Sequence, residues 1–157
     1  MVKINVNIDP IKLLLKEHEV FEKLLFEFSD IIKESKNNLD IIRLNKLFKK
    51  LYVLWTNHEQ KEERFFPLIE KPSFKIHVEK MFFDHKKLKP HKDSLNNAIL
   101  SCDKDVIVSS LEKHGELVIQ ELREHLDYEN EYLFMITEKE YSKDELEKAW
   151  KDAGNLI

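Results

Sequence analysis

The sequence contains little glycine, proline or cysteine. Its 157 residues include two glycines, four prolines and one cysteine. The scarcity of glycine and proline argues against a β-rich fold with many turns and favours long helices. A single cysteine, Cys102, excludes an intrachain disulfide and is typical of a protein in a reduced, intracellular setting.

Long apolar runs and an excess of basic charge are also missing. No stretch approaches the roughly 20 apolar residues of a membrane-spanning helix. The first ten residues, MVKINVNIDP, contain no signal-peptide-like apolar segment, so we expect a cytoplasmic protein without a membrane partner. The 30 acidic and 26 basic side chains are mixed along the chain, with a net charge of -4, which argues against nucleic acid as a partner. The length suits one domain, residues 1–157.

Apolar residues instead recur every three or four positions in four long segments, which predicts four amphipathic helices. A short fifth helix is predicted over about residues 142–153, because Ser142 and Glu145 form an S-x-x-E capping box and Gly154 follows. Pro90 is expected to bend the third helix near residues 86–90, with the helix continuing through Leu95 and Ile99. The four long helices are predicted to begin near Asp9-Pro10, Asp40, Pro72 and Asp103, the second reaching the region of Pro67 and the fourth roughly Met135.

Four long amphipathic helices joined by short loops are typical of an all-α, up-down-up-down four-helix bundle. We therefore predict a bundle core over about residues 10–136 and a short C-terminal fifth helix. That helix carries Leu146 and Trp150 on one face, so it either packs on the bundle or joins a second copy in a homo-oligomer. The aromatic residues near the histidines are expected in the core: Phe21, Trp55, Phe65, Phe66 and Phe82.

One histidine continues the apolar stripe of each long segment, and two of these histidines are followed by a glutamate at i+4. Residues four apart share a helix face, so packing of the bundle would point all six side chains inward. One inward histidine is more often explained by a single hydrogen bond. Six buried polar groups are costly unless metal coordination offsets the cost. The six are His18, His58, Glu62, His85, His125 and Glu129.

The donor count suggests more than one cation. Two six-coordinate cations have about twelve positions, of which two bridging glutamates, four histidines and a bridging oxygen would fill about ten. Two other metal motifs do not fit: "HEQKE" lacks the second histidine of a zinc protease, and no histidine has glutamate three residues before it, as in ferritin-like bundles. A bundle without metal is the remaining alternative.

Several segments resemble the hemerythrin-like (HHE cation-binding) family over roughly residues 10–136. They are "HEQKEERFFP", the pair Asp84-His85 and "HLDYENEYLF", following the lone His18. The resemblance implies a non-heme di-iron centre, oxo- or hydroxo-bridged, that binds O2, NO or a related ligand such as peroxide. It also implies four terminal histidines, His18, His58, His85 and His125, and two bridging glutamates, Glu62 and Glu129.

Two departures separate the chain from the oxygen carriers of that family. The carriers have His-x-x-x-His on the third helix, but Lys89 follows four residues after His85. They also have His-x-x-x-x-Asp on the last helix, where this chain has His125-x-x-x-Glu129. The pattern is more similar to the iron-sensing, nitric-oxide-related and iron-repair branches. Three residues are alternatives for an additional ligand, with exposed or structural roles as the simpler interpretation: Glu59, His77 and His91.

Two classes of function follow. The first is a di-iron protein for sensing, binding or stress response; the second is a peroxidase-like redox enzyme or an iron donor that repairs damaged iron centres. Whether the chain is an enzyme stays open at this point. Zinc or manganese can substitute for iron, since imidazole and carboxylate donors accept them as well.

Overall fold

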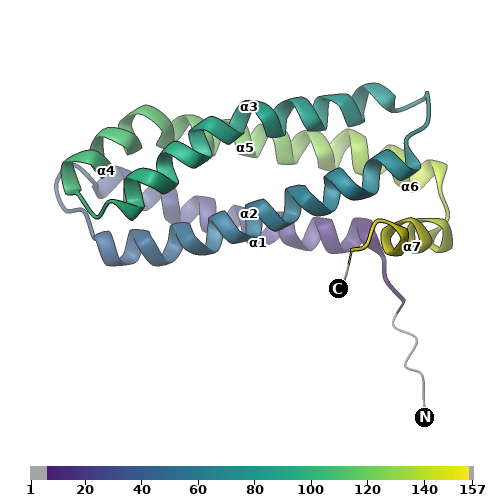
Figure 1. Ribbon diagram of the computed structural model, residues 1–157, viewed down its shortest axis with the longest axis horizontal. Coiled ribbons are helices and arrows are strands. Elements are labelled where there is room, and N and C mark those ends of the chain that lie inside the picture. The colour runs from purple at the N-terminus through teal and green to yellow at the C-terminus, as the bar shows by residue number, and fades with distance from the viewer. Residues whose placement is uncertain (1–6, 156–157) are drawn as a thin grey trace, which may run out of the picture.

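The computed structural model describes residues 7–155 and is all-helical over that range, which confirms the predicted fold class. Four antiparallel rods lie side by side and a short helix packs near one end (Figure 1). The first three rods are α1 (Pro10–Glu34), α2 (Ile41–Ile69) and α3 (Lys75–Leu100). The fourth rod comprises α4 (Lys104–Ser110), η1 (Leu111–Gly115), α5 (Glu116–Tyr128), η2 (Glu129–Leu133) and α6 (Phe134–Glu140). The short helix that follows it is α7 (Lys143–Asp152).

Most helix starts follow the local signals in the sequence. The side chains of Asp9 and Asp40 accept hydrogen bonds from backbone N–H groups three residues later, at 3.1 and 3.0 Å. Asp103 caps α4 in the same way, and the capping box of Ser142 and Glu145 is present at α7. These caps satisfy N–H groups that the first helical turn leaves without partners.

The prediction for Pro72 is wrong, whereas the predicted continuation of α3 beyond Pro90 is confirmed. Pro72 does not lie in the first turn of α3, which begins at Lys75 after Phe74 as N-cap. α3 continues as an α-helix through Pro90, as α2 does through Pro67. A proline removes one N–H donor, but the bonds of the flanking turns hold each of these helices together across it.

The fourth rod contains two π-helical turns, η1 and η2, which the apolar periodicity did not predict. At the end of η1, Gly115 lies against α1: a Cβ added there would be 2.7 Å from Ile32 Cδ1. A side chain at this position would therefore require the end of the Ile32 side chain to move.

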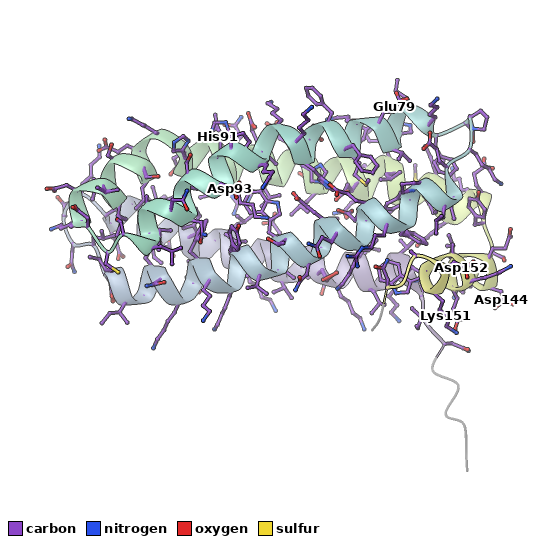
Figure 2. All side chains as sticks on the ribbon, viewed as in Figure 1. Glu79, His91, Asp93, Asp144, Lys151 and Asp152 are labelled. Atoms are coloured by element: carbon purple, nitrogen blue, oxygen red, sulfur yellow. The ribbon has the colours of Figure 1, made fainter. Side chains whose placement is uncertain are left out.

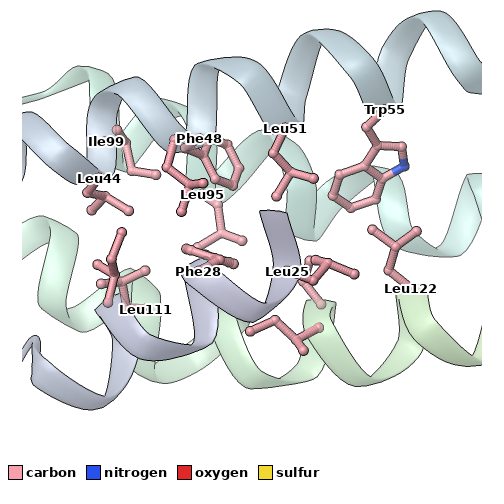
Figure 3. Packing of buried hydrophobic residues seen from close by; sticks show 14 of the residues in the cluster. Leu25, Phe28, Leu44, Phe48, Leu51, Trp55, Leu95, Ile99, Leu111 and Leu122 are labelled. Carbon is pink, nitrogen blue, oxygen red and sulfur yellow. The ribbon is translucent and has the colours of Figure 1, made fainter. Parts of the chain in front are cut away.

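Apolar side chains form two clusters, one on each side of the polar residues of the bundle. The loop-end cluster lies toward the α1–α2 and α3–α4 connections (Figure 3). The α7-end cluster lies toward the opposite end and includes residues of α7. The loop-end cluster includes Phe21, Leu25, Phe28, Leu44, Phe48, Leu51, Leu95, Ile99, Leu111 and Leu122, and the α7-end cluster includes Ile11, Leu14, Phe65, Phe66, Met81, Leu133, Phe134, Leu146 and Trp150.

α7 packs on the bundle, which was one of its two predicted positions. Trp150 is buried with its ring centroid 5.2 Å from that of Phe65. The charged side chains of Glu79, Asp144 and Lys151 lie on the outside (Figure 2). Phe82 is 38 % exposed, so its predicted place in the core is wrong. No helix within residues 7–155 has both the length and the hydropathy that crossing a membrane requires.

Candidate metal centre

The structure brings all six predicted site residues together in one layer of the bundle. Every one of them is buried, with between 0 and 4 % of its surface exposed. On each rod the layer separates the two apolar clusters; on α1, for example, His18 stands between Leu14 and Phe21. The layer comprises His18 on α1, His58 and Glu62 on α2, His85 on α3, His125 on α5 and Glu129 at the start of η2.

Four of these residues form the first group, which we call the His18–His58 half. The Nε2 atoms of the two histidines face each other at 3.1 Å. His18 Nε2 lies 3.3 Å from Glu129 Oε1, and His58 Nε2 lies 3.2 Å from Glu62 Oε1. One donor atom from each of the four residues lies within 4.8 Å of the others, a spacing that one cation can occupy.

The second group, the His85–His125 half, uses the same two glutamates. His85 Nε2 lies 3.4 Å from Glu62 Oε1, and His125 Nε2 lies 3.4 Å from Glu129 Oε1. The two imidazole rings are nearly perpendicular, with an interplanar angle of 72° and centroids 4.9 Å apart. Glu62 and Glu129 therefore belong to both groups of donors.

The inner atoms of this layer are not satisfied by protein hydrogen bonds. Among residues 7–155, both carboxylate oxygens of Glu62 and of Glu129 and the Nε2 atoms of His85 and His125 have no hydrogen-bond partner. The short nitrogen–oxygen approaches therefore lack hydrogen-bond geometry. Leaving buried polar atoms unpaired costs about 1–3 kcal/mol each, and more for charged groups. Buried histidines and carboxylates in this arrangement are compatible with a metal centre, whose ions would take these lone pairs.

The opposite side of each imidazole is held by a second polar side chain, and sequence analysis missed all four of these. His85 Nδ1 donates to Glu63 at 2.9 Å, and His125 Nδ1 donates to Asp84 at 3.0 Å. The other two pairs join His58 to Glu17 at 3.4 Å and His18 to Asn130 at 2.6 Å. Such bonds fix the tautomer in which Nε2 is free for a metal.

A signal for these four residues does exist in the sequence. Each is the immediate neighbour of a predicted site residue, but it contacts a histidine of a different helix. Adjacent positions on a helix are separated by about 100°, so the neighbour of an inward residue faces the adjoining helix. The four neighbours are Glu17 beside His18, Glu63 beside Glu62, Asp84 beside His85 and Asn130 beside Glu129.

The carboxylates change the protonation of the metal-free layer. Burial alone would lower the pKa of His85, but the close carboxylate of Glu62 and the hydrogen bond to Glu63 raise this pKa to about 10. Burial would also lower the pKa of His58 and of His125, but nearby carboxylates outweigh this effect and raise both pKa values. Conversely, burial would raise the pKa of Glu129, but His125 and its other polar neighbours hold that pKa well below its usual range. A cation must therefore displace protons from these imidazoles.

The three alternatives for an additional ligand lie in different surroundings. Glu59 accepts a hydrogen bond from Trp55 Nε1 at 2.5 Å, and its carboxylate lies within 4.8 Å of donor atoms of Glu63 and His85. His77 bonds the hydroxyl of Tyr128. His91 lies toward the α4 end of α3, where its Nδ1 is 2.9 Å from Nδ1 of His114 (Figure 2). Of the three, only Glu59 is in the neighbourhood of the centre.

A comparison with protein families agrees with this geometry. The model described as "Hemerythrin HHE cation binding domain" matches residues 9–137. The chain belongs to this family. No curated protein and no solved structure matches the chain. The hemerythrin HHE match ends before α7, although α7 contributes Leu146 and Trp150 to the α7-end cluster.

Proposed function

We propose that this hemerythrin HHE protein holds two iron ions and binds O2, NO or a related small ligand such as peroxide at them. The observation that carries the proposal is the pair of four-residue groups that share Glu62 and Glu129. Each group offers two imidazole nitrogens and two carboxylate oxygens. Four protein donors leave about two positions on each six-coordinate ion for a bridging oxygen and an outside ligand.

The six residues have distinct roles in this proposal. His18 and His58 would hold one iron, and His85 and His125 the other. Glu62 and Glu129 would bridge the pair, because each carboxylate approaches histidines of both halves. When bound, the iron pair would supply the redox chemistry and the open coordination positions.

The surrounding residues exclude water and fix the donors. The ring of Phe134 stacks on His18 with centroids 5.1 Å apart, and the ring of Phe21 lies edge-on to His58 at 5.2 Å. Both phenylalanines are buried, so they form an apolar wall on this side of the centre. The outer hydrogen bonds at Nδ1 hold each imidazole with Nε2 directed to the centre.

Metal analysis of protein purified without chelators tests the proposal. We expect about two irons per chain and an absorption spectrum in air that shifts when azide is added. Zinc or manganese at the same stoichiometry would keep the dinuclear site and contradict the assignment of iron. A chain that binds one ion or none would contradict the dinuclear site itself.

Peroxide consumption distinguishes the binder from a redox enzyme. A ligand-binding protein would show a reversible spectral change under air or NO without turnover of peroxide. A peroxidase-like enzyme would consume many equivalents of peroxide in the presence of a reductant. Transfer of iron to a metal-free acceptor would instead favour a role in repair.

A further inference from the structure

The two halves of the centre have the same donors but different outer partners. In the His85–His125 half, both imidazoles donate to carboxylates at short distances, 2.9 Å to Glu63 and 3.0 Å to Asp84. Both oxygens of Asp84 also accept from Lys80, at 3.1 and 2.8 Å, and Asp84 keeps its bond to His125. Both imidazoles in this half therefore have an anionic partner within ordinary hydrogen-bond distance.

The outer partners of the His18–His58 half are a neutral amide and a more distant carboxylate, which is paired with a lysine as Asp84 is. The partner of His18 is the neutral side chain of Asn130, at 2.6 Å. The partner of His58 is Glu17, but at 3.4 Å, and both oxygens of this carboxylate accept from Lys61 at 3.0 and 3.1 Å. A carboxylate partner raises the basicity of a ligating imidazole more than an amide does, so these two histidines are the poorer donors.

Access from solvent also favours the His85–His125 half. A cavity of about 260 Å³ between α3 and α5 is lined by His125 and Asp84, by the acidic side chains of Glu121 and Glu124 and by the basic side chains of Lys80 and Lys87. The His18–His58 half is instead covered by the rings of Phe21 and Phe134. The His85–His125 half therefore adjoins a cavity with three acidic and two basic side chains, whereas the rings over the His18–His58 half are apolar.

We propose that the two cation positions are inequivalent and that the His85–His125 half binds the first cation and binds it more tightly. This inference rests on the proposed dinuclear centre. The loss of one outer partner typically weakens metal binding 10- to 100-fold. Since the halves differ in the charge of one partner and the distance of another, we expect affinities that differ by about tenfold or more.

Two variants that each remove one half test the inference directly. His18→Ala leaves the His85–His125 half, and His125→Ala leaves the His18–His58 half. Metal-free samples are titrated with Co2+ without oxygen, and binding is followed by calorimetry and by the visible absorption of Co2+. We expect the single cation of His18→Ala to bind about tenfold or more tightly than that of His125→Ala. Equal or reversed affinities would overturn the inference.

A second pair of variants tests the cause of the difference. In the His125→Ala background, Asn130→Asp gives His18 an anionic partner and should tighten Co2+ binding by about tenfold. In the His18→Ala background, Asp84→Asn should weaken it by a similar factor. Asp144→Asn on α7 makes the same chemical change far from the centre and should have no effect. Unchanged affinity in both backgrounds would show that the outer partners do not set the order.

The outcome for the unaltered chain separates this inference from the proposed function. Two bound Co2+ ions per chain together with equal affinities in the half-site variants would retain the dinuclear centre and reject the inequivalence. Fewer than two bound ions would reject both. Circular dichroism of each variant identifies any that fails to fold. Glu63→Gln, which changes the partner of His85, replaces Asp84→Asn in that case.

Discussion

The loop-end cluster and the layer of histidines and glutamates beside it are both buried, but their contacts are satisfied in different ways. In the cluster, apolar side chains fill the space between the rods, as between the rings of Phe28 and Phe48, 5.6 Å apart (Figure 3). In the layer, the oxygens of Glu62 and Glu129 have no protein hydrogen-bond partner within the described range. The cluster can stabilise the bundle without any ligand, whereas the layer needs a cation to offset its burial. Fold and metal binding should therefore be separable by mutation.

The largest effect is expected in the layer. Glu62→Ala removes a donor from both halves, so iron content should fall from about two per chain to less than one. The melting temperature should fall toward that of the metal-free protein, because bound metal stabilises only the folded state. Metal analysis and thermal unfolding measure the two quantities together. Glu79→Ala, an exposed glutamate on α3, is the control, and unaltered iron content in Glu62→Ala would contradict the bridging role.

A core substitution in the loop-end cluster should produce the opposite combination. Phe28 is fully buried, and Phe28→Ala should lower the free energy of unfolding by about 3–5 kcal/mol. Iron content should stay at the value of the unaltered chain, because Phe28 lies more than two turns along α1 from His18. Urea denaturation and metal analysis give the two readings. Loss of iron in a folded Phe28→Ala variant would show that the two regions are not separable.

A change of one pH unit in the metal-free protein gives the smallest expected effect. The pKa of His85 is raised to about 10, so its folded-state pKa exceeds the unfolded value of 6.5. The stabilisation from its protonated form is complete below pH 6.5 and is lost as the pH rises toward 10. The free energy of unfolding should fall by about 1.4 kcal/mol per pH unit in that window from this group. Iron-loaded protein, whose ligating imidazoles are already deprotonated, should show a flatter profile in the same urea titrations.

The sequence was informative wherever a single helix determines the outcome. The caps at Asp9, Asp40 and Ser142 depend on residues within one turn, and the inward direction of His58 and Glu62 depends on helical spacing alone. The convergence of the layer needed one further assumption, that the four rods pack as a bundle. These features were accessible because the periodicity of a helix is fixed by its backbone geometry.

Features that depend on contacts between helices could not be predicted from the sequence. Asn130 and Asp84 hold histidines of other rods, and only the relative rotation of the helices determines which neighbour each one meets. Phe82 has an apolar aromatic side chain of the kind found in cores but lies on the exposed side of α3. The π turns were also not predicted, because an extra residue in one turn leaves the spacing of apolar residues on either side of it unchanged.

The π turn η2 determines which side of α6 faces the centre. Glu129 and Asn130 lie at its start, and Phe134, whose ring covers His18, follows it directly. If the same residues wound as an ordinary α-helix without this turn, α6 would be rotated by about 100° about its axis. The lid over His18 would rotate away while the carboxylate stayed in place. The extra residue of this π turn thus sets the exposure of the centre without being one of its six donors.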